Sequence, residues 1–304
     1  EEAATTTSTT QTGYCNARTP TSATVGGFCQ KVVTAGDIGT FEGTCTSSYG
    51  GTWSTSTDCT TSTTNRLGYC VYDATVSGVN SVTSTYFYSD STGLYRNTAD
   101  ALTFCDVLNG VNGTATWKTI YDGTYKSPCT DSTATVNSTA VYYTTQMTFA
   151  TNTVVATAKF YSGTSCSGTP ILTVTSNLKY AVDSDSTVSG AQKVNFIWPS
   201  TLTATTSTAD GTTDGATFFN TVFCASGNKT LVAGTQLDLA GNNCSNYGAV
   251  VAGDTEYTLI KLDTTNNTVV LGGPATAGRV FGPTSEGSRH TALDATASGV
   301  LTKQ

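Results

Sequence analysis

The sequence predicts an all-β protein of disulfide-stapled antiparallel β-sandwiches, arranged as two packed lobes with little helix. Three observations lead to this prediction. Ten cysteines are spread along the 304 residues instead of being clustered. Segments in which β-branched and aromatic residues alternate with polar ones recur along the chain. About a third of the residues are Ser or Thr, which favour strands, turns and caps over helix interiors.

The cysteines predict structural disulfides. Their number is even and their spacing is wide, as in proteins that fold in an oxidising compartment. Zinc sites use Cys-x-x-Cys pairs or histidine partners, and the chain has no such pair and one histidine, His290. We therefore expect disulfide bonds at Cys15, Cys29, Cys45, Cys59, Cys70, Cys105, Cys129, Cys166, Cys224 and Cys244.

The first elements are an arm and a lobe rich in Cys, Gly and Thr. Residues 1–12 contain no large apolar side chain, which predicts a flexible or partner-pairing amino-terminal arm. Residues 13–132 form the predicted first lobe. Its early part is expected to be loop-rich and held by bridges, and it repeats a Gly-aromatic-Cys triplet that begins at Gly13, Gly27 and Gly68.

Clear strand patterns follow. Alternation predicts strands over residues 82–88, 139–149, 154–161, 171–180 and 192–197, and a hairpin of residues 256–262 and 268–271 around a 263–267 turn. On this hairpin Glu256 and Lys261 should face opposite sides. One helix is predicted over 98–108, where apolar residues recur every three positions and Thr98 caps the start.

A Ser/Thr-rich stretch, residues 130–138, marks the predicted boundary between the first lobe and a second sandwich lobe of residues 133–304. Seven cysteines precede this stretch and three follow it. If all ten pair within the chain, at least one bridge must cross the stretch. We therefore expect two lobes that are tied covalently.

Composition argues against several partner classes. The formal net charge is −7, charged residues make up 12% of the chain, and no Lys/Arg cluster could neutralise several phosphates, so we expect no nucleic-acid binding. No apolar run is long enough for a membrane span. The chain opens on Glu1, so we expect a mature secreted chain whose export signal has been removed, located outside the cell or at its surface.

Covalent sugar and calcium are the possible non-protein components. Five Asn-x-Ser/Thr sequons, candidates for N-glycosylation, lie at Asn112, Asn137, Asn228, Asn243 and Asn266. Asn243 is the weakest of them because Cys244 occupies its middle position. We expect no cofactor. Calcium is a minority alternative, offered by the oxygen ligands of Asp183 and Asp185 and of Asp210 and Asp214, although neither pair follows EF-hand spacing.

Catalytic constellations are sparse, so no catalytic residue is predicted. His290 stands in a polar stretch, and the chain has no Gly-x-Ser-x-Gly elbow that would supply a serine partner. Glycoside hydrolysis needs two facing carboxylates, and the glutamates outside the arm are Glu42, Glu256 and Glu286. The tryptophans, Trp53, Trp117 and Trp198, could stack on sugar, but core packing is the simpler role, above all for Trp198 at a strand end.

In composition the chain resembles subunits of extracellular glycoprotein fibrils and surface coats, through its Thr and Ser abundance and its cysteine distribution. The sequence therefore predicts a noncatalytic, glycosylated structural subunit of an extracellular filament, sheath or coat. It would form a homopolymer, with the arm or an exposed strand edge of one copy pairing with the next. The alternatives are a secreted carbohydrate-binding module or adhesin and, third, a glycoside hydrolase.

Overall fold

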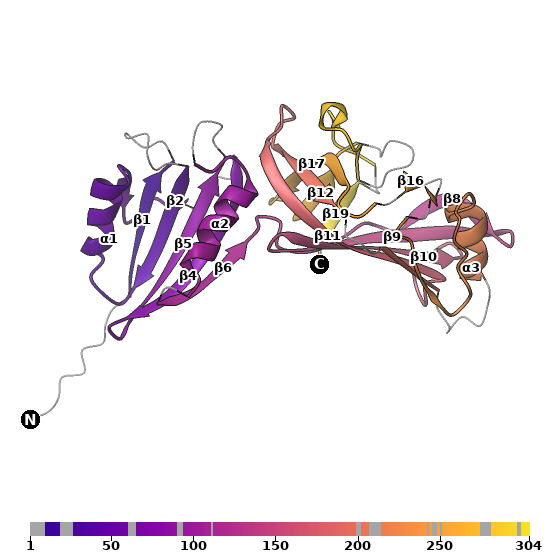
Figure 1. Cartoon of the computed structure of the whole chain (residues 1–304), viewed down its shortest axis with the longest axis horizontal. Helices are drawn as coiled ribbons and strands as arrows, with labels where there is room; N and C mark the ends of the chain where they lie inside the picture. Colours follow the sequence, from indigo (N-terminus) through magenta and orange to yellow (C-terminus); the bar gives the residue numbers. More distant parts are fainter. Residues whose placement is uncertain are drawn as a thin grey trace, which may run out of the picture. The chain divides into compact units, whose positions relative to one another are not determined.

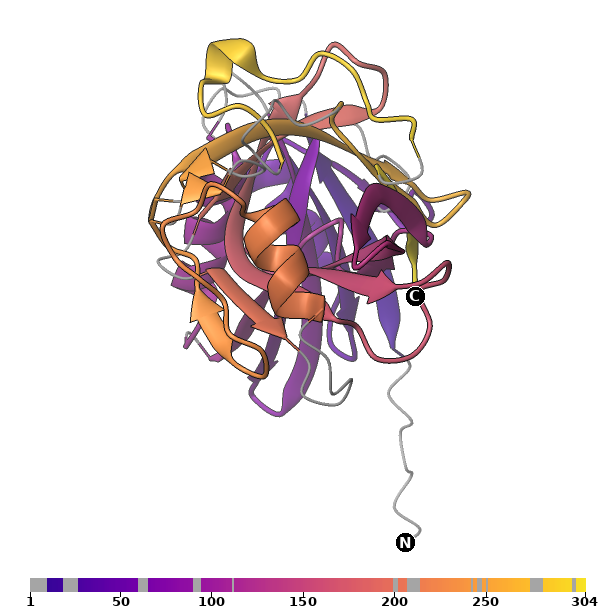
Figure 2. The ribbon, with the colours of Figure 1, turned by 90° about the vertical axis from the view of Figure 1, so that its right-hand side faces the viewer.

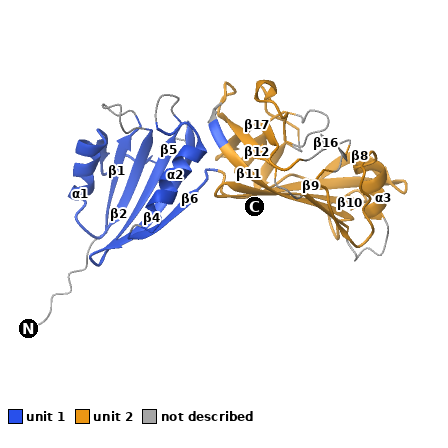
Figure 3. Cartoon of the chain, viewed as in Figure 1, with its two compact units in different colours: residues 1–120, 182–185 blue, residues 121–181, 186–304 orange. Residues whose placement is uncertain are grey.

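The computed structural model of the chain describes residues 10–18, 27–59, 65–89, 94–110, 112–198, 202–206, 214–241, 243–244, 248–249, 251–273, 281–296 and 299–304. It divides into two compact units, coloured separately in Figure 3. Unit 1 comprises residues 1–120 and 182–185, and unit 2 comprises residues 121–181 and 186–304. The predicted lobe boundary between residues 132 and 133 falls inside a strand of unit 2.

Unit 1 is one antiparallel sheet with short helices (Figure 1). The strand order is β3-β1-β2-β5-β4-β6. Its strands are β1 (Gln11–Ala17), β2 (Phe28–Thr34), β3 (Thr52–Ser54), β4 (Arg66–Val76), β5 (Val79–Tyr88) and β6 (Gly113–Lys118). Its helices are α1 (Gly39–Gly43), the π-helix η1 (Thr44–Ser48) and α2 (Thr98–Leu108).

Helix α2 covers one face of this sheet (Figure 1). Phe104 on α2 packs edge-on against Phe87 of β5, with ring centroids 5.5 Å apart, and Trp117 of β6 lies beside the same ring at 5.7 Å. The predicted helix bounds are confirmed, but the predicted cap is wrong by one residue. The side chain of Asn97 accepts hydrogen bonds from the backbone N–H groups of Ala99 and Asp100, whereas the hydroxyl of Thr98 donates to the carbonyl of Val182 and accepts from its N–H.

Two of the Gly-aromatic-Cys triplets lie within strands β1 and β4, and the third runs from a bend at Gly27 into the start of β2. The region around them was expected to be loop-rich, yet it contains β1, β2, β3 and the start of β4. Two of the glycines make room for tryptophan rings, since a Cβ on Gly13 would lie 2.1 Å from Trp53 and a Cβ on Gly68 would lie 2.4 Å from Trp117. These two triplets therefore combine a bridge-forming cysteine with a site where a large ring packs directly on the backbone.

Unit 2 contains the remaining strands. They are β7 (Gly123–Lys126), β8 (Thr130–Val136), β9 (Thr139–Ala150), β10 (Thr153–Ser162), β11 (Leu172–Asp185), β12 (Ala191–Ile197), β13 (Leu202–Thr206), β14 (Gln236–Asp238), β15 (Asn243–Cys244), β16 (Gly248–Ala249), β17 (Thr255–Asp263), β18 (Thr268–Leu271) and β19 (Val300–Lys303). The last four residues of the long strand β11 belong to unit 1. The predicted strands after residue 138 and the 263–267 hairpin turn are confirmed.

The main sheet of unit 2 closes on itself. Its order is β10-β9-β7-β19-β18-β17-β12-β11-β13-β14, and β10 also pairs with β11, which joins one end of the row to its interior. Inward residues such as Met147, Phe149, Val154 and Leu178 are fully buried inside the ring. The pairing places Phe149 opposite Val154, and Val154 opposite Leu178, so the alternation runs in register across three strands.

Two further helices, α3 (Asp214–Phe218) and the π-helix η3 (Phe219–Phe223), lie across the far part of β9 and β10 (Figures 1 and 2). Phe218 and Phe223 each pack on Phe160 of β10 with ring centroids 5.3 Å apart. A short 3-10 helix, η4 (Glu286–Ser288), follows strand β18 in the chain. One part of the inner face of the sheet is thus covered by the opposite strands of the closed ring, and another part is covered by these two helices.

All ten cysteines are paired, as predicted. The bonds join Cys15 to Cys45, Cys29 to Cys59, Cys70 to Cys105, Cys129 to Cys166, and Cys224 to Cys244. The Cys129–Cys166 bond crosses the 130–138 stretch, as the cysteine count required. Each of the five bonds nevertheless lies within one unit, because the units divide at residue 120 and not at residue 132.

The prediction of an all-β, disulfide-stapled fold is confirmed, whereas the sandwich arrangement is not. Alternation shows that one face of a strand is buried, but it does not show what covers that face. In unit 1 helices cover the sheet, and in unit 2 the sheet covers itself.

Candidate functional site

The three glutamates that a glycosidase could have used are placed in different surroundings. Glu42 lies exposed on α1 of unit 1, and Glu286 lies exposed on η4, 3.7 Å from Arg289. Glu256 is buried in β17 with 1% of its surface exposed. None of the three lines either of the two hollows described below.

The carboxylate of Glu256 serves as a buried clamp. Its Oε1 accepts a hydrogen bond from the indole Nε1 of Trp198 at 2.7 Å. Its Oε2 accepts bonds from the backbone N–H groups of Phe281 at 2.6 Å and Gly282 at 3.1 Å. A buried charge is tolerated when several donors satisfy it in this way. The clamp fixes the chain at 281–282 against the strand, and it orients the Trp198 ring.

Trp198 and Phe281 form one wall of a small hollow on the inner face of the unit 2 sheet, which we call the inner pocket. Its volume is about 80 Å³. Most of its lining is apolar, and the lining residues are Thr145, Ala156, Thr157, Ala158, Val174, Ser176, Trp198, Leu202 and Phe281. The space exists because the inward positions of β10 and β11 hold small residues at this level, with Ala156 paired opposite Ser176.

His290 and Arg289 hold the chain after η4 against the sheet. The ring Nδ1 of His290 lies 3.0 Å from the hydroxyl of Thr258, which is buried in β17. The Arg289 guanidinium donates to the carbonyls of Val194 and Thr258 and lies over the Tyr257 ring at 5.0 Å. His290 is half-buried, and this bond to a threonine hydroxyl lies within the fold.

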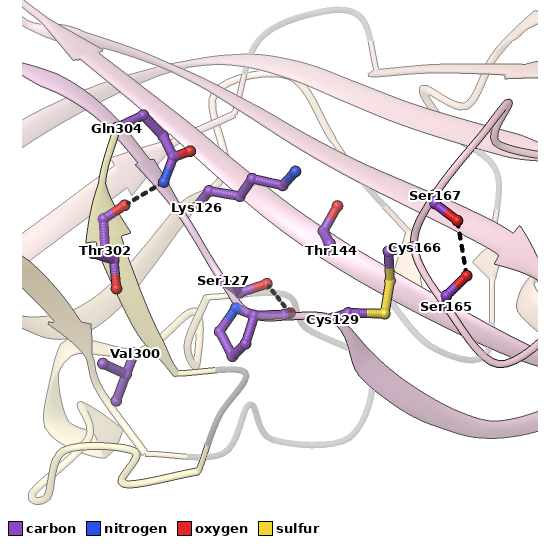
Figure 4. A pocket seen from close by; sticks show the side chains of 11 residues that line it. Lys126, Ser127, Cys129, Thr144, Ser165, Cys166, Ser167, Val300, Thr302 and Gln304 are labelled. Atoms are coloured by element: carbon purple, nitrogen blue, oxygen red, sulfur yellow. Dashed lines mark hydrogen bonds between the residues drawn. A yellow bond between two sulfur atoms is a disulfide. The ribbon is translucent and has the colours of Figure 1, made fainter.

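A second and larger hollow lies on the outer face of the same sheet (Figure 4). We call it the outer hollow, and its volume is about 580 Å³. It opens where β9 changes partner from β7 to β8, and the Cys129–Cys166 disulfide forms part of its wall. The remaining lining is rich in hydroxyls and amides and consists of Lys126, Ser127, Pro128, Thr144, Ser165, Ser167, Val300, Thr302 and Gln304.

The disulfide at the outer hollow differs from the other four in exposure. Cys129 is exposed and Cys166 is half-buried, while the eight cysteines of the other bonds are buried. Ser165 and Ser167 flank Cys166, and their hydroxyls lie 2.9 Å apart (Figure 4). The outer hollow therefore presents hydrogen-bonding groups and one accessible sulfur bridge to solvent.

The described sheet edges are short or blocked. Strand β6 carries a cap made by the turn before it, since Ala115 N–H donates to the Asn109 side chain and Gly110 N–H donates to the Gly113 carbonyl. Strand β14 is three residues long, and the ammonium of Lys229 bonds to the carbonyl of Asp238 at 2.9 Å. Strand β3 is also three residues long, and β8 contains a register shift. Such features discourage unspecific strand pairing.

The sequence expectations for the arm concern residues largely outside the described part of the chain. Residues 1–9 lie there, and Thr10 is exposed. The last two residues of the predicted arm belong to β1, where Gln11 pairs with Thr34 and Thr12 pairs with Val33 of β2. The part of the predicted arm that the structure does not describe is residues 1–9, which we call the amino-terminal segment.

The sequons differ in their local bonding. Asn112 and Asn228 are exposed. Asn137 is also exposed, and its side-chain amide donates to Asp214 at 2.6 Å. Asn266 is exposed in the hairpin turn, where its amide donates to Asp263 at 2.7 Å. The side chain of Asn243 lies outside the described residues.

Each of the two candidate calcium pairs is described only in part. Asp183 lies in the part of β11 that belongs to unit 1, and Asp214 starts α3 in unit 2. Asp210 and the side chain of Asp185 lie outside the described residues. Within the described ranges, no group of three or more His, Cys, Asp or Glu residues is placed to hold a metal ion.

Comparison with known proteins adds no assignment. No family model matches the sequence, and no curated protein is significantly similar to it. In the part of the chain that is described, no helix is long and apolar enough to span a membrane.

The inner pocket was missed from the sequence, although one signal for it was present. In β11 the inward positions are Leu172, Val174, Ser176 and Leu178, and a serine interrupts this apolar series. A polar residue at an inward strand position indicates either a buried hydrogen bond or a site. The outer hollow gave no such signal, because it depends on where strands distant in sequence begin and end.

Proposed function

We propose that this chain is a noncatalytic structural subunit of an extracellular filament, sheath or surface coat, and that its amino-terminal segment links one copy to the next. The observation that carries the proposal is the complete pairing of ten cysteines within the two units. The bonds close loops with sequence separations from 20 to 37. Each loop of this size restricts the unfolded chain by about 3 to 4 kcal/mol of free energy in the loop-entropy model.

These five disulfides suit a protein that acts outside the cell. Disulfides persist in oxidising compartments, and a subunit of an exposed assembly must survive there without repair. The buried Glu256 and the half-buried His290 are engaged in bonds within the fold. The ionisable groups most suited to chemistry thus act as structural ties.

Controlled assembly is the second support. An assembling subunit has to avoid pairing by any open strand, and the capped edges of β6 and β14 provide that protection. We propose a dedicated segment as the route of assembly. Residues 1–9 precede the exposed Thr10, and an extended segment of nine residues reaches up to about 30 Å.

Electron microscopy of the purified full chain tests the proposal. We expect ordered polymers from the full chain, and folded monomers after deletion of residues 1–9. The deletion must stop before Gln11, because Gln11 and Thr12 contribute to the β1–β2 ladder and their loss would confound folding with assembly. A matched control replaces residues 1–9 with a Gly/Ser segment of equal length. Monomers of the full chain at high concentration, or polymers of undiminished length from the deletion variant, would refute the proposal.

A carbohydrate-binding module is the second candidate, and the outer hollow is the observation that favours it. Hydroxyl and amide side chains such as Thr144, Thr302 and Gln304 could exchange hydrogen bonds with a sugar. A glycan array with the wild-type chain and a Thr302→Val variant tests this role. Saturable binding that the variant loses supports it, and absence of binding across the array rejects it.

A further inference from the structure

The disulfide in the wall of the outer hollow joins segments that backbone hydrogen bonds already hold together. Strand β9 lies between β8 and β10, and its residue Tyr143 pairs with Thr130 on one side and with Phe160 on the other. Thr130 follows Cys129 directly in the chain. The strand pairing therefore holds the Cys129 side of the bond in place whether or not the sulfurs are joined.

The loop that carries Cys166 is fixed at both of its ends. The backbone N–H of Gly163 donates to a carbonyl of β9, and the N–H of Ile171 donates to a carbonyl of β10, each at 2.8 Å. Opening of the disulfide therefore frees the middle of this loop and leaves the β8–β9 and β9–β10 ladders intact.

Two of the other disulfides have a different place in the fold. The bond from Cys15 to Cys45 ties η1 to β1, and the bond from Cys70 to Cys105 ties α2 to β4. A helix forms no backbone ladder with a strand, so these buried bonds hold packed elements that hydrogen bonds do not join. The accessible bond at the outer hollow duplicates an existing connection, and it is thus the one that can react while the fold persists.

Positive charge lies at this hollow although the chain as a whole is acidic. Lys126 is the only charged side chain among the described lining residues, and it extends along the hollow in Figure 4. Lys159 pairs opposite the lining residue Thr144, so these two share a face of the sheet. In the described part of the chain neither ammonium has an ion-pair partner. Asp131 accepts a bond from the N–H of Thr133 and does not line the hollow. The hollow therefore favours a small anion.

We propose that the outer hollow is a site of thiol–disulfide exchange for a small thiol that carries a carboxylate. Its volume of about 580 Å³ lies within the range of small-molecule sites, roughly 300 to 1,000 Å³. The carboxylate of the thiol pairs with the ammonium of Lys126. The thiolate attacks the Sγ of Cys129, because Cys129 is exposed and Cys166 is half-buried. This inference goes beyond the proposed function and holds for a monomer and for a polymer alike.

The exchange needs no oxidant and no reductant besides the thiol. The thiol first loses its proton to water. Its sulfur then forms a bond to the Sγ of Cys129 while the bond between Cys129 and Cys166 breaks, and the electron pair of that bond leaves on Cys166. The Cys166 thiolate takes a proton from water. The product carries the small thiol on Cys129 as a mixed disulfide and has a free thiol at Cys166.

The experiment compares an anionic, a neutral and a cationic thiol on the native full chain: mercaptoacetate, mercaptoethanol and cysteamine. Acid quenching, alkylation and peptide mass spectrometry give the rate at which each thiolate opens the bond. Each rate is divided by the rate of the same thiolate on the neutral disulfide of N-acetylcysteine amide, which removes differences in intrinsic nucleophilicity. At low ionic strength we expect this ratio to be about 5-fold higher for mercaptoacetate than for mercaptoethanol, and lowest for cysteamine. Added salt should reduce the preference.

Three variants assign the preference to the hollow. Lys126→Met should remove most of it, and Lys126→Arg should retain it because the charge remains. Lys179→Met is the matched control and should leave it unchanged. Lys179 is exposed on the same sheet and pairs with Thr153, at the end of the β10–β11 ladder that is remote from the Cys166 loop.

Four results would overturn the inference. They are equal ratios for the three thiols, a preference that persists in Lys126→Met, a first adduct on any cysteine other than Cys129, and loss of the near-UV circular dichroism as the bond opens. An adduct on Cys129, with the anionic preference and an unchanged spectrum, supports it. None of these readouts depends on polymerisation, so the proposed function and this inference stand or fall separately.

Discussion

The Glu256 clamp gives the most direct test of how the core of unit 2 is held together. Replacing Glu256 with Gln preserves the size of the side chain but leaves one acceptor oxygen where the carboxylate has two. If that oxygen keeps the bonds to Phe281 and Gly282, the amide NH₂ faces the Nε1–H of Trp198, which is then buried without an acceptor. A buried donor left unsatisfied costs about 1 to 3 kcal/mol.

Urea unfolding with the disulfides intact measures this loss. With an m-value of about 3 kcal/mol/M, the midpoint should fall by roughly 0.3 to 1 M while m stays unchanged. Glu286→Gln is the matched control, because Glu286 is 65% exposed and should shift stability by less than about 0.5 kcal/mol.

A double mutant isolates the indole bond. Trp198→Phe removes the Nε1–H, so Glu256→Gln should cost at least about 1 kcal/mol less in that background. Equal costs in the two backgrounds, or a Glu256→Gln midpoint equal to that of Glu286→Gln, would show that the clamp does not act as described.

Three further predictions follow from exposure and from pKa shifts. Brief treatment with a mild phosphine should open Cys129–Cys166 before the four buried disulfides, as alkylation and peptide mass spectrometry would show; earlier opening of a buried bond contradicts the exposure argument. The hydrogen bond from the Asn266 side chain, helped by backbone N–H groups, lowers the pKa of Asp263. These bonds therefore stabilise the folded chain above the ordinary carboxyl pKa, and their contribution is lost as pH falls through the lowered one. Asp263→Ala should lower the melting temperature near pH 7, and the difference from wild type should vanish at strongly acidic pH. Burial raises the pKa of Tyr95 to about 12, so the folded chain favours the neutral phenol and loses stability as pH rises from the ordinary value of 10.0 toward 12. Tyr95→Phe should flatten that loss in alkaline unfolding curves, and an unchanged slope would count against the burial effect.

The strands with large alternating residues could be predicted from sequence, and those built from Thr, Ser and Gly could not. In β9 the inward positions include Val141, Met147 and Phe149, which gives a strong period-two signal. Strand β8 is Thr130–Val136, and its Ser/Thr composition was interpreted as a boundary. Hydroxyl residues suit both loops and pleated strands, so composition alone does not separate the two.

Closure of the sheet could not be predicted for a different reason. Nothing in the local pattern of β10 distinguishes a strand with one neighbour from a strand that pairs on both sides, with β9 and with β11. The disulfide pattern was equally open, since ten cysteines allow many pairings. Of the candidate site, only Ser176 carried a local signal, as a polar residue in an inward register.

The β10–β11 pairing has a consequence for the rate at which unit 2 unfolds. Unfolding of an open sheet can begin at a peripheral strand, which peels away by breaking one ladder at a time. Each strand in the unit 2 ring pairs with a neighbouring strand on both sides. The first strand that leaves the ring must therefore break two rows of backbone hydrogen bonds together. Slow unfolding protects a protein from proteases where no chaperone is present. The lifetime of the folded state then depends on the height of the unfolding barrier more than on the free energy of unfolding.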